Sequence, residues 1–112
     1  MPHVMIDCSA DILNDNALAS LVKNVHQAVA NTGLFNVENI KTRCVPARHY
    51  RVGNGNKSYI HVEIRIRPGR DIADKNVLSA SVLNIIKKDR LSDVVTVEII
   101  DMDSSCYSKY SS

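Results

Sequence analysis

The same order of patterns, a strand, a helix and a second strand, occurs twice along the 112 residues. In the first half, apolar and polar side chains alternate from residue 2, apolar residues recur at helical spacing over about residues 15–31, and alternation resumes at Ile40. The second half repeats this order with a strand from Tyr59, a helix after Asp71 and a strand over residues 93–101. His3-Val4-Met5-Ile6 also matches His61-Val62-Glu63-Ile64 at an offset of 58 residues, which indicates a duplication.

Local sequence signals mark the ends of these elements. Asn14 or Asp15 is suited to cap the first helix, and Gly33 can adopt the left-handed conformation that ends it. The strand that begins at Ile40 is expected to continue irregularly past Pro46 toward Tyr50, with the proline at an edge or a bulge. A turn over residues 53–56 follows.

The repeat predicts an α+β, two-layer fold. Each half is long enough for a right-handed parallel β-α-β unit, and two units give a four-stranded sheet with both helices on one face. The length favours a single domain over 1–112, with halves of about 1–57 and 58–112. The open sheet face predicts an oligomer, and the polar tail from Ser104 is expected to fray or to lie on a neighbouring subunit.

Composition excludes several classes of protein. Hydrophobic residues make up 45% of the chain and charged residues 23%, which is unlike disordered or membrane proteins. The first residues do not form a secretion signal and no segment is long and apolar enough to span a membrane, so we expect a cytoplasmic protein. The three cysteines are widely spaced, which favours reduced thiols over a disulfide framework or a zinc site.

The net charge of +2 conceals an asymmetry. Between residues 41 and 70 there are eight lysines and arginines against one carboxylate, Glu63, so this segment carries +7 and the remainder −5. Most such side chains serve as the solvated face of a sheet. One or two of them are nevertheless candidates for binding an anion.

Pro2 directly follows the initiator methionine and opens the first strand. A small second residue normally permits removal of the methionine, which leaves the secondary amine of Pro2 as the chain terminus. An α-amine titrates nearer neutrality than a lysine, and an apolar pocket or neighbouring cations lower its pKa further. Such an amine can act as a general base at pH 7. The alternative interpretation is that this proline only affects processing and stability.

Several segments together resemble the 5-carboxymethyl-2-hydroxymuconate isomerase family of the tautomerase superfamily. The resemblance runs in register from residue 2 to about residue 100. It is carried by the following segments: Pro2-His3-Val4-Met5-Ile6-Asp7-Cys8-Ser9, Thr32-Gly33-Leu34-Phe35, Ile40-Lys41-Thr42-Arg43, Tyr59-Ile60-His61-Val62 and Gly69-Arg70.

The resemblance implies a homotrimer and a cofactor-independent, metal-free keto–enol isomerase that acts on a 2-hydroxymuconate-type dienol in aromatic-compound catabolism. It implies that Pro2 moves the proton, and that Arg70 and Arg43 bind carboxylates and stabilise negative charge on the 2-oxygen. Lys41 stands where the family has arginine and is expected to bind substrate, although an ammonium lacks the bidentate fork of a guanidinium.

A second hypothesis belongs to a different class of function. Basic residues with interleaved aromatics, here Tyr50 and Tyr59, are typical of surfaces that bind nucleic acid or another polyanion. A non-catalytic binding module of this kind leaves Pro2 unexplained. Its pI, near 8.5, is also below the value of about 9 or more that is typical of dedicated nucleic-acid domains, so nucleic acid is an unlikely partner.

Overall fold

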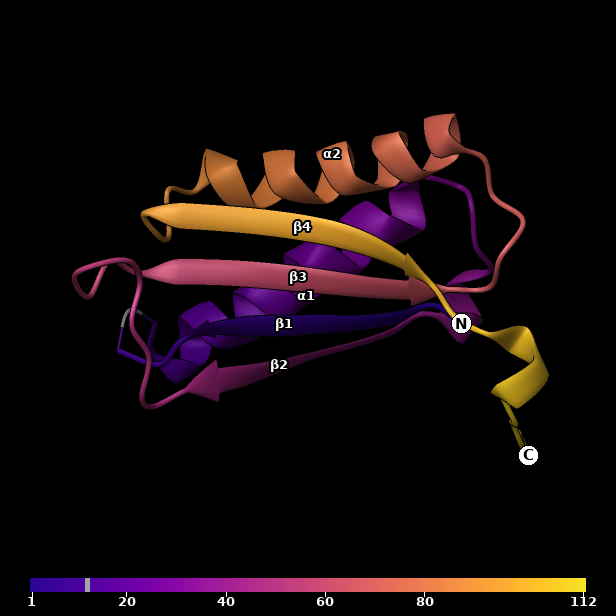
Figure 1. Cartoon of the computed structure of the whole chain (residues 1–112), viewed down its shortest axis with the longest axis horizontal. Coiled ribbons are helices and arrows are strands. Elements are labelled where there is room, and N and C mark those ends of the chain that lie inside the picture. Colours follow the sequence, from indigo (N-terminus) through magenta and orange to yellow (C-terminus); the bar gives the residue numbers. More distant parts are fainter. Residues whose placement is uncertain (12) are drawn as a thin grey trace.

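The computed structural model describes residues 1–11 and 13–112 and contains the predicted four-stranded sheet with two helices (Figure 1). The strands lie in the order β2-β1-β3-β4. The first unit comprises β1 (His3–Ser9), α1 (Asp15–Asn31) and β2 (Lys41–Ala47). The second comprises β3 (Tyr59–Ile66), α2 (Ile72–Lys88) and β4 (Val94–Asp101).

Strand pairing confirms the two β-α-β units. β1 pairs with β2 in parallel, β3 pairs with β4 in parallel, and β1 and β3 join the units in antiparallel register. Met5 pairs with Glu63 across this central junction. The same two residues correspond at the offset of 58, so the pseudo-twofold axis that relates the halves passes between them.

The predicted capping residues begin both helices. The Asn14 side chain accepts a hydrogen bond from the Ala17 amide at 2.8 Å, and the Asp71 side chain accepts one from the Asp74 amide at 2.8 Å. These bonds satisfy amides that have no partner within the helix. Gly33 follows α1 with a φ of 71°, as its place at the helix exit predicts.

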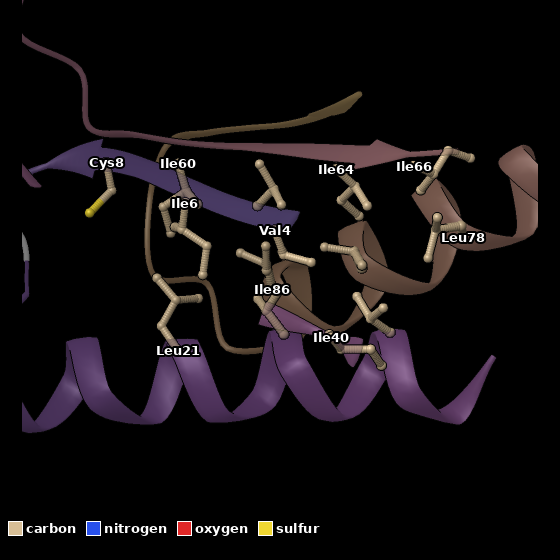
Figure 2. Packing of buried hydrophobic residues seen from close by; sticks show 14 residues of the cluster. Val4, Ile6, Cys8, Leu21, Ile40, Ile60, Ile64, Ile66, Leu78 and Ile86 are labelled. Carbon is tan, nitrogen blue, oxygen red and sulfur yellow. The ribbon is translucent and has the colours of Figure 1, made fainter. Parts of the chain in front are cut away.

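The core lies between the sheet and the two helices (Figure 2). Alternate residues of β1 and β3 point toward the helices and are fully buried, and they meet three buried residues from each helix. These side chains are Val4, Ile6, Cys8, Ile60, Val62, Ile64 and Ile66 from the strands and Leu21, Val25, Val29, Leu78, Val82 and Ile86 from the helices. The opposite sheet face carries mainly polar and charged side chains, and no helix of the described chain covers it.

Two sequence predictions are wrong in detail. β2 ends at Ala47 and does not continue toward Tyr50, because Ala47 pairs with Ser9, the last residue of β1, and no partner strand extends further. Pro46 does lie on an edge strand, as predicted. The tail is predicted to fray or to lie on a neighbouring subunit, but its Tyr107 lies against β1 of the same chain.

Candidate active site

A cavity of about 500 Å³ opens beside the amino terminus of β1. Four segments form its wall: the first residue, the α1–β2 loop, the turn after β3 and the carboxyl-terminal tail. The lining residues are Met1, Leu34, Phe35, Asn36, Asn39, Arg67, Pro68, Gly69, Arg70 and Lys109.

Pro2 is buried directly behind Met1. Its carbonyl accepts a hydrogen bond from the Lys41 amide at 3.1 Å, which extends the parallel β1–β2 pairing by one residue. The start of the chain is therefore fixed at the sheet and next to the cavity. A chain that begins at Pro2 carries its amine at this position.

The electrostatic environment of the amino terminus disfavours a positive charge. Burial, as the largest cause, lowers the pKa of the Met1 amino group from 8.0 to about 6. The positive charges of Lys41, Lys109 and Arg67 lower it further, in that order, because each repels the ammonium form. An amine with this pKa is mainly neutral at pH 7.

Arg70 lines the same cavity and is held in place by the α1–β2 loop. Its guanidinium donates a hydrogen bond to the Leu34 carbonyl and lies 5.3 Å from the centre of the Phe35 ring. Gly69 precedes it with a φ of 119°, which only glycine adopts readily, and this turn brings the chain from β3 to the cavity wall. The remaining donors of Arg70 are available to an anion.

Lys41 and Arg43 lie on the open face of the sheet, but at different distances from the amino terminus. The Lys41 ammonium donates a hydrogen bond to the Asn39 carbonyl at 2.9 Å and acts directly on the terminal amine. Arg43 instead contacts His3, with 3.4 Å between Nη1 and Nδ1, and does not line the cavity. Burial, followed by the charges of Arg43 and Lys41, lowers the pKa of His3, so its imidazole is neutral at pH 7.

The predicted residues therefore separate into two groups. Arg70 lines the cavity with Met1, the residue before Pro2, and Lys41 acts on the terminal amine, whereas Arg43 contacts His3 and lies outside the cavity. Sequence reasoning did not single out Arg67 or Lys109, which also line the cavity. Arg67 belongs to the basic segment, but no sequence signal distinguishes Lys109, because only the folded tail brings it there.

The other chemistry-bearing groups do not belong to this site. Burial, as the largest cause, raises the pKa of the Cys8 thiol to about 12, and its sulfur lies 3.6 Å from that of Cys44, so Cys8 is a core side chain as predicted. Within the described residues, no three side chains of histidine, cysteine, aspartate or glutamate gather as a metal site would require. None of the described helices has the length and apolar character needed to cross a membrane.

Three other surface hollows lie away from the amino terminus, and one of them, between α1 and α2, is lined by none of the predicted site residues. An open groove of about 1070 Å³ at the end of α2 is lined by Lys87, Lys88 and Arg90 among others, but by none of the predicted site residues. A second groove, of about 640 Å³, includes Arg48 and Tyr50. The Tyr50 hydroxyl donates to Asp11 at 2.7 Å. The amino-terminal cavity is therefore the candidate active site, because the terminal amine of lowered pKa and Arg70 both border it.

Comparisons with known proteins show the family to which the chain belongs. The family model described as 5-carboxymethyl-2-hydroxymuconate isomerase matches residues 2–103. The chain is 26% identical over 89 residues to the Escherichia coli 5-carboxymethyl-2-hydroxymuconate Delta-isomerase, covering 78% of this chain and 71% of the relative.

Solved structures share the fold at lower sequence identity. A crystal structure of a 5-carboxymethyl-2-hydroxymuconate delta-isomerase superposes with a TM-score of 0.85 and 16% identity, covering 99% of this chain and 89% of that chain. A fused 4-OT protein, described as a wild type symmetric trimer, superposes with a TM-score of 0.79 and 14% identity, covering 92% of this chain and 87% of the other.

Proposed function

Because the chain belongs to the 5-carboxymethyl-2-hydroxymuconate isomerase family and is an isomerase of the tautomerase type, we propose that it ketonises a 2-hydroxymuconate-type dienol dicarboxylate. The reaction moves one proton from the enol oxygen to a carbon of the conjugated system and needs no cofactor. A role in the catabolism of aromatic compounds, in the cytoplasm, completes the proposal.

Pro2 is the general base in this mechanism. Removal of Met1 frees its secondary amine, and the burial and the cations that lower the pKa of the Met1 amino group also favour the neutral form of an amine at Pro2. The nitrogen accepts the proton of the 2-hydroxyl group, a carbonyl forms at C2, and the shifted electron pair takes the same proton at carbon. A positioned base of this kind typically contributes a factor of about 100 to 10,000 to the rate.

Cations stabilise the charge that the base creates. Arg70 binds a substrate carboxylate through the donors that Leu34 leaves free, and Lys41 supplies positive charge beside the developing 2-oxyanion. Arg43 points from the open sheet face, so we propose that it acts at a site shared with a neighbouring subunit. A homotrimer, as described for the fused 4-OT protein, provides such a neighbour.

One observation carries the proposal: the amino terminus, where burial and cations lower the pKa of the Met1 amino group to about 6, borders the same cavity as an arginine that has no carboxylate partner among the described residues. A chain terminus with a purely structural role requires neither an amine of lowered pKa nor an arginine without a carboxylate partner. An amine base and a carboxylate-binding group are together what enol–keto transfer on an acidic substrate requires.

An ultraviolet assay of 2-hydroxymuconate ketonisation tests this function. We expect Arg70→Ala to lower kcat/KM by about 100-fold through the loss of a charge-assisted contact. Pro2→Ala should lower kcat by about 10-fold or more, because a flexible primary amine replaces the fixed secondary one. Arg48→Ala, from the same basic segment but another groove, is the matched control and should retain full activity.

Equal rates for the wild-type protein, Pro2→Ala and Arg70→Ala would refute the assignment. If the wild-type protein shows no turnover but binds nucleic acid in a salt-sensitive manner, the polyanion-binding function is the correct one.

A further inference from the structure

The carboxyl-terminal tail folds back onto the amino-terminal end of the sheet, and Figure 1 shows it leaving β4 beside the start of the chain. The Tyr107 hydroxyl lies 3.1 Å from His3 Nε2 on β1. The guanidinium of Arg67, just after β3, lies 5.6 Å from the centre of the Tyr107 ring. One aromatic side chain therefore attaches the tail to two central segments of the sheet at once.

Lys109 lies two residues after Tyr107 in the tail and lines the cavity. The Lys109 ammonium donates a hydrogen bond to Asn39 Oδ1 at 3.4 Å. Arg70 is held at Leu34 and Phe35, so the two cations lie against opposite ends of the segment from Leu34 to Asn39.

Both charges lack a counterion in the part of the chain that the structure describes. The ion pairs found there join His61 to Glu98, Arg65 to Glu63 and Lys75 to Asp101, and none involves Arg70 or Lys109. Arg67 also lines the cavity, but its guanidinium lies over the Tyr107 ring. Arg70 and Lys109 are two further, separated cations without a counterion, and such a pair is complementary to a molecule with two separated carboxylates.

We propose that the carboxyl-terminal tail is a wall of the active site and that Lys109 binds the second carboxylate of a dicarboxylate whose first carboxylate binds Arg70. The inference rests on the proposed function and deepens it, because it assigns the preference for a diacid over a monoacid to a residue outside the β-α-β repeat. Tyr107 is a positioning residue in this arrangement, since it fixes the tail and does not line the cavity.

A matched pair of probes isolates the second carboxylate. The compounds trans,trans-muconate and sorbate share one six-carbon diene, and muconate carries a carboxylate at both ends whereas sorbate carries one. We expect the wild-type protein to bind muconate about 10-fold more tightly than sorbate in calorimetric titrations, which corresponds to one charge-assisted contact.

Lys109→Met should reduce muconate affinity to the level of sorbate and leave sorbate affinity unchanged, whereas Lys109→Arg should retain the preference. Lys88→Met removes the same charge at the distant groove on α2 and should retain it as well. Tyr107→Leu should lose the preference although Lys109 is present, because the tail is released.

The inference is overturned if the wild-type protein does not prefer muconate, or if Lys109→Met keeps the preference. Binding and turnover separate the two claims. A protein that ketonises 2-hydroxymuconate with equal KM in the wild type and in Lys109→Met contradicts the role of the tail and leaves the function intact. A preference that depends on Lys109 without any ketonisation contradicts the function and supports the tail site.

Discussion

At the scale of single residues, we expect the proposed reactivity of Pro2 to depend on the cations that surround the terminal amine. Lys41 has the largest electrostatic effect on the terminal amine, after burial. Its charge opposes the ammonium form, so removing that charge favours protonation and raises the pKa of the amine. We expect the acidic limb of the pH profile of kcat/KM to move upward by about half a pH unit in Lys41→Met.

The control for this prediction is Lys87→Met, which removes one positive charge at the remote end of α2 and should leave the limb in place. A limb that stays fixed or moves to lower pH in Lys41→Met would contradict the electrostatic explanation.

The sequence singled out the residues whose place is set by local signals or family position, and missed those that depend on tertiary contacts. Pro2 could be singled out because it opens the first strand, and Arg70 because Gly69-Arg70 resembles a position of the family. Lys109 could not, because its position depends on how Tyr107 docks against His3. The sequence likewise could not show that Arg43 lies outside the cavity, because this depends on the contacts of the edge strand β2.

At the scale of elements, the alternation of apolar residues and the capping residues predicted both helices and all four strands. The errors have a common physical origin, because they concern segments whose partners are not encoded locally. β2 ends opposite the last residue of β1, and the sequence of β2 alone does not indicate where the strand ends. The tail binds through a hydroxyl and an aromatic ring, which hydrophobic periodicity does not detect.

The two halves share their backbone plan but not their chemistry. The pseudo-twofold axis relates His3 to His61, and it relates Arg43 on β2 to Glu98 on β4. His3 contacts Arg43 in the first half, whereas His61 contacts Glu98 at 3.1 Å in the second. The position equivalent to Pro2 at the offset of 58 is Ile60, a buried residue within β3. The two halves therefore share a fold, but only the first half begins at a chain terminus that can carry an amine.

At the scale of the whole molecule, the open sheet face is the surface that we expect an assembly to cover. Val45 lies on this face at the edge strand and is 56% exposed. We predict that the wild-type protein has a solution mass near three times 12.4 kDa by light scattering, and that Val45→Glu dissociates it by placing a charge in the interface.

Val77→Glu is the matched control, since Val77 is 53% exposed but lies on α2, away from the open face. A wild-type mass of 12.4 kDa, or equal dissociation by both substitutions, would argue against assembly through the sheet.

The central claim is that the free amine of Pro2 performs the proton transfer, and one comparison of two forms of the same chain tests it most directly. The form that begins at Met1 holds the Pro2 nitrogen in an amide, which has no basic lone pair. Treatment with methionine aminopeptidase, followed by intact mass, gives the form that begins at Pro2. We predict that this form ketonises 2-hydroxymuconate at least about 100-fold faster than the form that retains Met1. Equal rates for the two forms would contradict the mechanism.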